Sequence, residues 1–382
     1  SPPAPPSRGA AVPAGGFVSE VVLRREAVKE VVRELERVFG GRLLASPAEA
    51  GGPSPGPPPA SVLPSTIEEV RLVSEIAGRH GVPLVARGAG TIAEEAPPGS
   101  VVVRFDLMRR IRVPEAPAEM WVEAEAGAPW LALEEALGRR GRGLAVYPTS
   151  APRATVGGWL ATGGLGVGSF EYGRMHENVL KARVVLPGGE LREVDGGELG
   201  PSGGAVGRSG IVVEARLRAR RADADVPFAI GLPGVGGLLA GIEALLEAGV
   251  PLWHAAFLNP AMARARGVAG EGYLLFGAYP EGRSAEVAGG LGRVVRRGKG
   301  RLLPLARARR LWGERFFPVM PGHEIPGSAR WFVSVGKLSE VLASVERLPE
   351  LLSVGVAMQG TIGNSGEVLL LSFDAREAGR VP

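Results

Sequence analysis

Two glycine-rich segments constrain the fold of this chain more than any other feature. An apolar stretch from Pro83 to Ala86 runs into Arg87-Gly88-Ala89-Gly90-Thr91, and a second segment runs from Thr155 to Gly166. Glycine lets a turn adopt positive φ and lets its backbone N–H groups approach a pyrophosphate closely. No third glycine opens a long helix after Gly90, which disfavours a nicotinamide-type dinucleotide fold. Because the chain has 58 glycines, the first turn taken alone is equally compatible with an ordinary turn.

The two segments together indicate a long ligand with two ends. Each segment follows an apolar strand, and an acidic, helix-forming stretch lies between them. FAD is a ligand of this kind, with a pyrophosphate in the middle and a ring system at each end. The pairing of the turns, rather than either turn alone, therefore predicts an FAD site.

Composition excludes several other classes. The absence of cysteine excludes disulfides, cysteine-ligated iron–sulfur clusters and a cysteinyl-linked flavin. No apolar run approaches the length of a membrane span and no signal peptide is visible, so we expect a cytoplasmic protein that meets a membrane only through a partner. The net charge is +4, but the arginines are scattered and no nucleic-acid-binding motif occurs, so nucleic acid is not an expected partner.

The first third of the chain divides at a proline-rich loop. Residues 1–60 are expected to hold a poorly ordered start over 1–16, an amphipathic helix over 25–39 and an irregular loop over 51–59. The apolar face of that helix is expected to contain Val28, Val31, Val32, Leu35 and Val38.

Two further parts follow, both of α+β character. Residues 61–222 alternate short strands with helices, end in a hairpin and a long strand, and predict a domain with mixed sheets. Residues 223–382 follow the order strand–helix–strand–strand twice, which predicts a two-layer antiparallel α+β domain. In the second repeat we expect a strand over 352–358.

From about Ser61 to Arg220 the chain resembles the FAD-binding domain of the vanillyl-alcohol oxidase and p-cresol methylhydroxylase (PCMH) superfamily. Within that superfamily it is most similar to the glycolate oxidase and D-lactate dehydrogenase flavoproteins. Seven landmarks occur in the family's order, over residues 64–70, 83–91, 101–111, 122–130, 155–166, 171–179 and 207–217. The resemblance implies a PCMH-type FAD-binding domain over 61–222 and a cap domain over 223–382 that contacts substrate or a partner.

The resemblance also implies which residues hold FAD. The first turn and the start of the second segment would lie along the pyrophosphate and ribityl chain, and the later residues would lie near the flavin ring. The implied set is Arg87, Gly88, Ala89, Gly90, Thr91, Pro148, Thr149, Ser150, Thr155, Gly157, Gly158, Thr162, Gly163, Gly166, Gly210, Ile211 and Val212.

Several positions depart from the family pattern. Members with covalent flavin carry a histidine where this chain has Thr91, so the resemblance implies non-covalent FAD. Trp159 replaces a family asparagine. In the cap, Gln359 and Asn364 stand where the hydroxy-acid enzymes carry metal ligands, so no metal site is expected.

Candidates for catalysis are few. His176 is a candidate by its position in the FAD domain, although a structural role is the favoured alternative. Arg315 lies in a segment similar to the family's Trp-x-x-Arg and could bind a substrate carboxylate bidentately, or could equally lie on a helix surface. The other histidines are His80, expected at a surface, His254, expected to be packed, and His323, expected in a surface turn beside Glu324.

Three functions stay open at this point. The first is an FAD-dependent oxidoreductase of the glycolate oxidase or D-lactate dehydrogenase type, working as an E-like subunit beside a catalytic flavoprotein and an iron–sulfur chain. Such a subunit would pass electrons from a small 2-hydroxy acid to its partner, and the isolated chain would turn over little. The second is a non-catalytic flavin-binding or structural subunit of such a complex. The third is a free-standing FAD oxidoreductase of alcohols or sugar acids.

Overall fold

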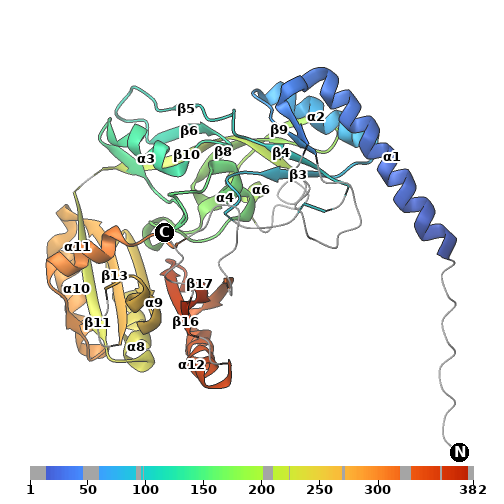
Figure 1. Ribbon diagram of the computed structural model, residues 1–382. Helices are drawn as coiled ribbons and strands as arrows, with labels where there is room; N and C mark the ends of the chain where they lie inside the picture. Colours follow the sequence, from blue (N-terminus) through green and yellow to red (C-terminus); the bar gives the residue numbers. More distant parts are fainter. Residues whose placement is uncertain are drawn as a thin grey trace, which may run out of the picture. The chain divides into compact units, whose positions relative to one another are not determined.

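The chain adopts a mixed α+β fold (Figure 1). The computed structural model describes residues 14–45, 60–91, 96–97, 99–200, 210–222, 224–268, 272–318, 328–352 and 355–376. Packing separates two compact units, one made of Ser1–Ala86, Glu95–Arg104 and Pro187–Glu190, the other of Arg87–Glu94, Phe105–Leu186 and Leu191–Pro382. The domain boundaries inferred at 60 and 222 stay predictions.

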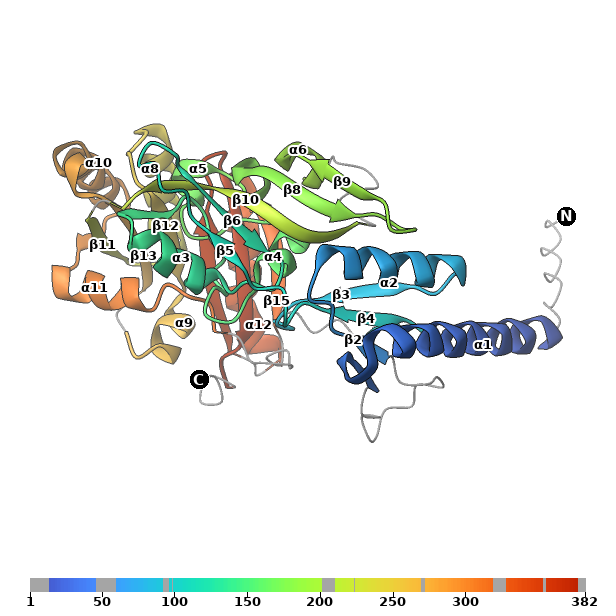
Figure 2. The same ribbon diagram turned by 90° about the horizontal axis from the view of Figure 1, so that it is seen from above.

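The first unit contains two helices and a small sheet. Helix α1 (Ala14–Phe39) contacts α2 (Ile67–Arg79), as Figure 2 shows. The sheet has the order β1 (Leu43–Ala45), β2 (Ala60–Val62), β4 (Val101–Arg104), β3 (Leu84–Arg87), with β2 and β4 parallel. The Thr66 hydroxyl accepts a hydrogen bond from Glu69 N and so caps the start of α2. Helix α2 is one of the helices expected between the short strands of residues 61–222.

Helix α1 differs from the sequence-based expectation at both ends. It begins at Ala14, inside the stretch expected to be poorly ordered. Val38 is 46% exposed, whereas Phe39 is buried. On a helix surface, Phe39 lies one turn after the buried Leu35 and on the same face. Phe39 therefore takes the buried position that the sequence analysis assigned to Val38.

A partly buried ion pair in this unit predicts that the fold loses stability in acid. Arg42 donates both amino groups to Glu69, each at 2.6 Å, and Ser65 N donates to the same carboxylate at 2.7 Å. These hydrogen bonds lower the pKa of Glu69 from 4.5 to about 2. A carboxyl with a depressed folded pKa stabilises the fold above its unfolded pKa and loses that effect as pH falls towards the folded value. We expect about 1–2 kcal/mol of unfolding free energy to be lost in this acidic range.

Urea denaturation at a series of pH values measures this effect. Glu69→Gln should be less stable at neutral pH and should show a flatter decline between about pH 5 and 2. Glu68→Gln, on the exposed side of the same helical turn, should keep the wild-type decline. Equal slopes for Glu69→Gln and the wild type would contradict the assignment.

An antiparallel sheet forms the first part of the second unit, within the residues predicted to form the FAD-binding domain. Its strand order is β5 (Ile111–Arg112), β6 (Trp121–Glu125), β10 (Ile211–Arg221), β8 (Val179–Val185), β9 (Leu191–Val194), and β7 (Arg142–Leu144) pairs with β10. Helices α3 (Trp130–Gly138) and α4 (Val156–Thr162) contact this sheet (Figure 2). The hairpin predicted over 182–194 is confirmed as β8 and β9. Short helical segments α5 (Ser169–Tyr172), η2 (Met175–Asn178) and α6 (Gly196–Leu199) follow α4.

The cap forms one seven-stranded antiparallel sheet. Its order is β14 (Arg301–Leu302), β11 (Asp225–Leu232), β13 (Tyr273–Pro280), β12 (His254–Leu258), β16 (Val356–Ile362), β17 (Glu367–Asp374), β15 (Ala329–Ser334). The described helices are α8 (Val235–Glu247), α9 (Pro260–Ala265), α10 (Ser284–Arg297), α11 (Leu305–Gly313) and α12 (Val335–Leu352), as labelled in Figure 1 where room allows. The predicted antiparallel α+β architecture is confirmed.

The strand order reveals two copies of one unit. In the first copy β11, α8, β12 and β13 place the last strand between the other two, and in the second copy β15, α12, β16 and β17 do the same. The copies join where β12 pairs with β16. The repeat suggested by the sequence is therefore present in the topology, although the strand expected from 352 begins only at Val356, because α12 continues through Leu352.

The two faces of the cap sheet have different covers. One face packs against α8, α10 and α12 through apolar side chains such as Phe257 and Leu370. The other face carries Ala256, Phe276 and Phe373, which pack with residues of α9 and α11. Among the helices that the structure describes, none combines the length and apolar character of a membrane span.

Candidate functional site

The first glycine-rich segment forms a turn directly after β3. A Cβ on Gly88 would lie 2.2 Å from Thr155 Oγ1 and 3.5 Å from Gly158 Cα, so no side chain fits there. Gly90 has a φ of +66°, which favours glycine, and the space around its Cβ position is open. The turn therefore meets the second segment at Gly88 and leaves open space at Gly90.

Thr155 lies where the two segments meet. It precedes α4, but its side chain makes no capping hydrogen bond. Its hydroxyl is buried and finds no hydrogen-bond partner among the residues that the structure describes. Burying an unpaired hydroxyl costs free energy, so the position suits a ligand oxygen as the missing partner.

Backbone hydrogen bonds tie the second segment to the sheet. Gly157 N donates to Ala126 O at 2.8 Å, and Ala126 N donates to Val213 O at 2.9 Å. A Cβ on Gly157 would lie 2.7 Å from the Ala126 Cβ. The chain of bonds connects the start of β10, where residues 210–212 are predicted to meet the flavin edge, to the turn at Thr155.

A second meeting point lies at the other end of α4. Tyr147 and Val167 exchange backbone hydrogen bonds of 3.1 and 2.8 Å. A Cβ on Gly166 would lie 2.1 Å from Tyr147 O, and Gly163 has a φ of +62° with open space around it. Residues 148–150, predicted to approach the flavin ring or its ribityl chain, follow Tyr147 directly. Helix α4 thus connects the two predicted ends of the site.

Two predicted contact residues have other partners. The Gly157 N–H is engaged by Ala126 O, and the Gly166 N–H donates to Ser169 Oγ at 2.9 Å. These two glycines therefore shape the site through close packing and have no free donor to offer. Trp159, the replacement for the family asparagine, is buried and packs edge-on against Trp130 with ring centroids 5.2 Å apart.

The family comparison covers the same part of the chain. Residues 58–195 match the family described as FAD binding domain, and this range includes both glycine-rich segments. The chain contains an FAD-binding domain. The open turn at Gly90 fits the pyrophosphate of FAD, because it offers backbone N–H groups without an obstructing side chain. The unpaired Thr155 hydroxyl lies beside Gly88 of the same turn.

Curated relatives match only part of the chain. The chain is 34% identical over 137 residues to a mitochondrial D-lactate dehydrogenase [cytochrome] of Arabidopsis thaliana, which covers 35% of this chain and 24% of that protein. It is 30% identical over 175 residues to D-2-hydroxyglutarate dehydrogenase of Escherichia coli, which covers 43% of this chain and 17% of that protein. The matches thus span a quarter or less of these two relatives.

Solved structures share the fold over nearly the whole chain. A p-cresol methylhydroxylase with substrate bound superposes with a TM-score of 0.71 at 14% identity and covers 93% of this chain and 85% of that one. An alkyldihydroxyacetonephosphate synthase superposes with a TM-score of 0.68 at 17% identity and covers 92% of this chain and 82% of that one. The PCMH-type FAD-binding fold predicted from the sequence is confirmed.

Arg315 lies beside the turn that is predicted to approach the flavin ring. Its Nε donates to Tyr147 Oη at 3.1 Å and its Nη1 to Trp312 O at 2.9 Å. Its guanidinium lies 4.6 Å from the Trp312 ring and 4.3 Å from the Phe316 ring. Phe317 N donates to Thr149 O at 2.9 Å. This bond fixes the segment against residues 148–150, which we call the flavin turn. Tyr147 was not among the predicted site residues, because its contact with Arg315 joins positions 168 residues apart.

The electrostatic surroundings leave Arg315 without an ion pair. Within the described ranges, no carboxylate lies in salt-bridge distance of it. Burial raises the pKa of Tyr147 to about 12, so its hydroxyl stays protonated and accepts the Arg315 hydrogen bond as a neutral group. Glu134 interacts with Tyr147 and Arg315 only through longer-range electrostatics. Burial raises the pKa of the Glu134 carboxyl.

The histidines lie in four different surroundings, and the catalytic role of His176 stays a prediction. The His176 ring lies against Gly200 of the segment after α6, and burial lowers its pKa. His80 Nε2 pairs with Glu34 Oε1 at 2.7 Å in the first unit, where it is only partly exposed. His323 and Glu324 lie outside the described residues. His254 is fully buried, as its predicted packing implies, yet it lacks a partner for either ring nitrogen in the part of the chain that the structure describes.

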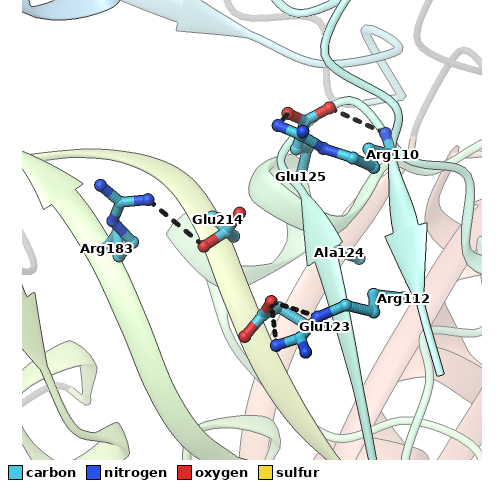
Figure 3. Close-up of a pocket in the computed structure, with 7 residues that line it drawn as sticks. All are labelled: Arg110, Arg112, Glu123, Ala124, Glu125, Arg183 and Glu214. Carbon is cyan, nitrogen blue, oxygen red and sulfur yellow. Dashed lines mark hydrogen bonds and ion pairs between the residues drawn. The ribbon is translucent and has the colours of Figure 1, made fainter. Parts of the chain in front are cut away.

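A hollow of about 350 Å³ opens on the charged face of the sheet that contains β6 and β10 (Figure 3). None of the residues that line it belongs to the predicted FAD or catalytic set. It is lined by Arg110, Arg112, Glu123, Ala124, Glu125, Arg183 and Glu214.

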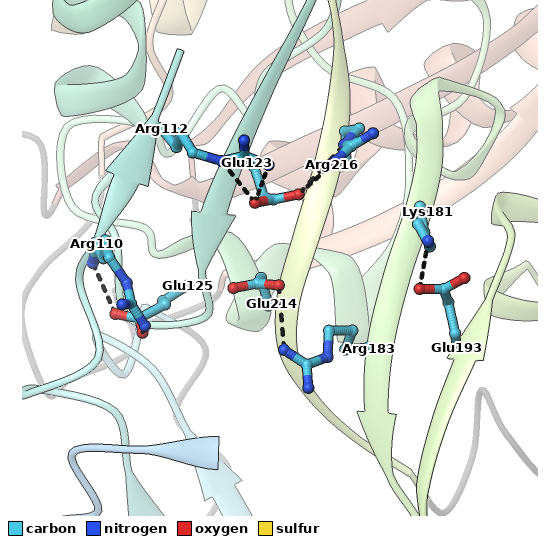
Figure 4. A network of polar contacts seen from close by, with 9 residues as sticks. All are labelled: Arg110, Arg112, Glu123, Glu125, Lys181, Arg183, Glu193, Glu214 and Arg216. Carbon is cyan, nitrogen blue, oxygen red and sulfur yellow. Dashed lines mark hydrogen bonds and ion pairs between the residues drawn. The ribbon is translucent and has the colours of Figure 1, made fainter. Parts of the chain in front are cut away.

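The charges around this hollow neutralise one another (Figure 4). Arg110 pairs with Glu125 at 2.7 Å, Arg183 with Glu214 at 3.6 Å, and Arg112 with Glu123 at 2.7 Å. Burial opposes ionisation of Glu123, but hydrogen bonds from Arg112 and Arg216 lower its pKa overall. Because each of these carboxylates is paired with at least one arginine, the face stabilises the sheet across neighbouring strands.

Proposed function

We propose that this chain is an FAD-dependent oxidoreductase that acts on a small 2-hydroxy acid. The observation that carries the proposal is the position of Arg315 beside the flavin turn, with no carboxylate of the described residues paired to it. A guanidinium offers its donors in a planar fork that matches a carboxylate, so a carboxylate substrate is the natural partner. The D-lactate and D-2-hydroxyglutarate dehydrogenases among the relatives support this substrate class.

The chain's own residues would orient the substrate. Tyr147 holds Arg315 Nε, and Trp312 O holds Nη1, so the guanidinium presents its remaining donors in one direction. The aromatic rings of Trp312 and Phe316 restrict its rotation. Bound FAD supplies an acceptor for a hydride. Oxidation of the hydroxyl carbon releases that hydride and one hydroxyl proton, which leaves a 2-oxo acid.

Anaerobic mixing tests the proposal in a single turnover. FAD-loaded chain is mixed with glycolate, D-lactate or D-2-hydroxyglutarate, and the absorption of oxidised flavin is followed. Bleaching by one of these acids, and not by acetate or propionate, is the expected result. Unchanged absorption with all three hydroxy acids, in the presence of tightly bound FAD, would overturn the proposal for the isolated chain.

A second arrangement is an E-like subunit that needs a partner flavoprotein and an iron–sulfur chain. The environment of Gln359, where the hydroxy-acid enzymes have a metal ligand, favours it. Gln359 Oε1 accepts from Arg266 at 2.6 Å and its Nε2 donates to Arg315 O at 3.0 Å, so both ends of the amide are engaged. Under this arrangement, flavin bleaching and dye reduction appear only after a partner is added, and zinc or manganese alone restores neither.

The FAD is proposed to be bound without a covalent link. Thr91 offers no ring nitrogen at the place where covalent members of the family carry histidine, and the sequence has no cysteine. We expect acid precipitation of the FAD-loaded chain to release all flavin into the supernatant. Free FAD mixed with unloaded chain and precipitated in the same way serves as the control. Flavin fluorescence that stays with the washed, denatured polypeptide would contradict the non-covalent assignment.

A further inference from the structure

The cap sheet buries an unusual polar pair on the face that meets the flavin turn. His254 and Thr361 both have no solvent exposure. Both ring nitrogens of His254 and the hydroxyl of Thr361 lack a hydrogen-bond partner among the described residues. A buried polar group without a partner destabilises a fold, so native proteins keep few of them. Two such groups on one sheet face indicate a partner that is not part of the described chain.

The register of β12 and β16 places the two side chains together. Ala256 pairs directly with Thr361 in the antiparallel ladder. His254 precedes Ala256 by two residues and therefore points to the same face as Ala256 and Thr361. His254 and Thr361 are consequently diagonal neighbours, at a spacing that one small molecule spans. Gln359 lies on the same face two residues before Thr361, but both ends of its amide are engaged.

Trp312, at the start of the segment from Trp312 to Phe317, lies beside His254 of this polar pair. The His254 ring lies 5.8 Å from the Trp312 ring and 6.4 Å from the Phe276 ring, centroid to centroid. Trp312 is only partly buried, so one side chain separates His254 from the surroundings of Arg315. The same segment bonds to Thr149 of the flavin turn. The unpaired groups therefore lie between the cap sheet and the place where the proposed function puts substrate.

His254 has the charge state of a hydrogen-bonding group. Burial, assisted by the nearby Arg315, lowers its pKa to about 3. The imidazole is therefore neutral at physiological pH and offers one acceptor and one donor. A hydroxyl group likewise donates once and accepts, so the two are complementary.

We propose that His254 and Thr361 form the subsite for the hydroxyl group of the substrate, while Arg315 holds its carboxylate. This inference rests on the proposed function, because it takes the ligand to be a small 2-hydroxy carboxylate. Entry of the ligand displaces the Trp312 ring from the His254 imidazole. The hydroxyl group then completes the hydrogen bonds that the protein leaves open, and a carboxylate without a hydroxyl does not.

Matched ligands and matched variants test the subsite in the full FAD-loaded chain. Glycolate and acetate differ by one hydroxyl, and their binding is measured by calorimetry on chain whose FAD has been reduced beforehand, so that glycolate binds without being oxidised. The wild type should bind glycolate about tenfold more tightly than acetate. His254→Leu should remove that preference and leave acetate affinity unchanged, and Thr361→Val should reduce the preference in the same direction.

Thermal unfolding supplies a second readout, independent of the ligand. Because each variant removes an unpaired buried group, both should raise the Tm of the ligand-free chain, by about 2 °C. Asn259→Leu is the matched control. Asn259 accepts from Met262 N and Met358 N and donates to Val356 O, so replacing this satisfied buried group should lower the Tm.

The outcomes separate this inference from the proposed function. If the wild type prefers glycolate and His254→Leu keeps that preference, the subsite is overturned while the proposed function stands. A fall in Tm for His254→Leu as large as that for Asn259→Leu also overturns the subsite, since the imidazole would then be partnered within the protein. Binding of neither acid by the FAD-loaded wild type overturns both.

Discussion

Gly90→Val is expected to leave the chain folded and nearly free of FAD. Gly90 has a φ of +66° and open space around its Cβ position. A β-branched residue cannot adopt that conformation without strain of about 1–3 kcal/mol, and its methyl groups would project into the space that a phosphate needs. The ratio of flavin to purified protein, measured from absorption spectra, should fall close to zero.

Gly81→Val is the control for backbone strain. Gly81 has a φ of +64° and, like Gly90, nothing within 4 Å of its Cβ position, but it lies in the turn after α2. It should therefore cost comparable stability and keep its flavin. Equal flavin loss in the two variants would show that strain, not obstruction of the site, empties the protein.

Gly88→Ala probes the contact between the two glycine-rich segments. A Cβ at this position would lie 2.2 Å from Thr155 Oγ1, and only rotation of the threonine hydroxyl relieves the clash. The rotated hydroxyl could no longer meet a phosphate oxygen beside Gly88. Flavin binding should therefore be weakened rather than abolished. An unchanged affinity would separate Thr155 from the phosphate site.

The sequence predicted local features of the first turn. Gly88 and Gly90 follow an apolar strand, and Gly90 adopts the positive φ that glycine permits. The βαββ repeat of the cap was also predictable, because its strands and helices have distinct periodicities. The sequence did not show that residues 156–162 form helix α4, since glycines at 157 and 158 argue against a helix.

Contacts between distant segments lay beyond sequence reasoning. The Arg315–Tyr147 hydrogen bond and the burial of His254 depend on how the cap sheet packs against the FAD domain. From the sequence, His254 was expected to be packed, and its burial agrees with that expectation. What the sequence could not supply is that both ring nitrogens lack a partner in the described structure. A sequence does not distinguish a buried histidine whose ring nitrogens are hydrogen-bonded from one whose ring nitrogens are not.

Arg315→Met is expected to raise the Kd for glycolate or D-lactate about 100-fold in the FAD-loaded chain. Hydrogen bonds to a charged partner contribute about 1.5–3 kcal/mol, which corresponds to one to two factors of ten in affinity. Methionine keeps much of the apolar contact with Trp312 and Phe316 but removes the charge. Arg315→Lys should recover only part of the loss, because an ammonium group cannot bind a carboxylate bidentately.

Arg309→Met separates this effect from a general loss of positive charge. Arg309 lies on the exposed side of α11, six residues before Arg315. It should bind substrate as the wild type does, and both methionine variants should retain their FAD. Tyr147→Phe removes the hydroxyl that holds Arg315 Nε and should weaken substrate binding by about threefold to tenfold, with flavin content unchanged. Wild-type affinity in Arg315→Met would remove the observation on which the 2-hydroxy acid assignment depends, because no other described feature of the site selects a carboxylate.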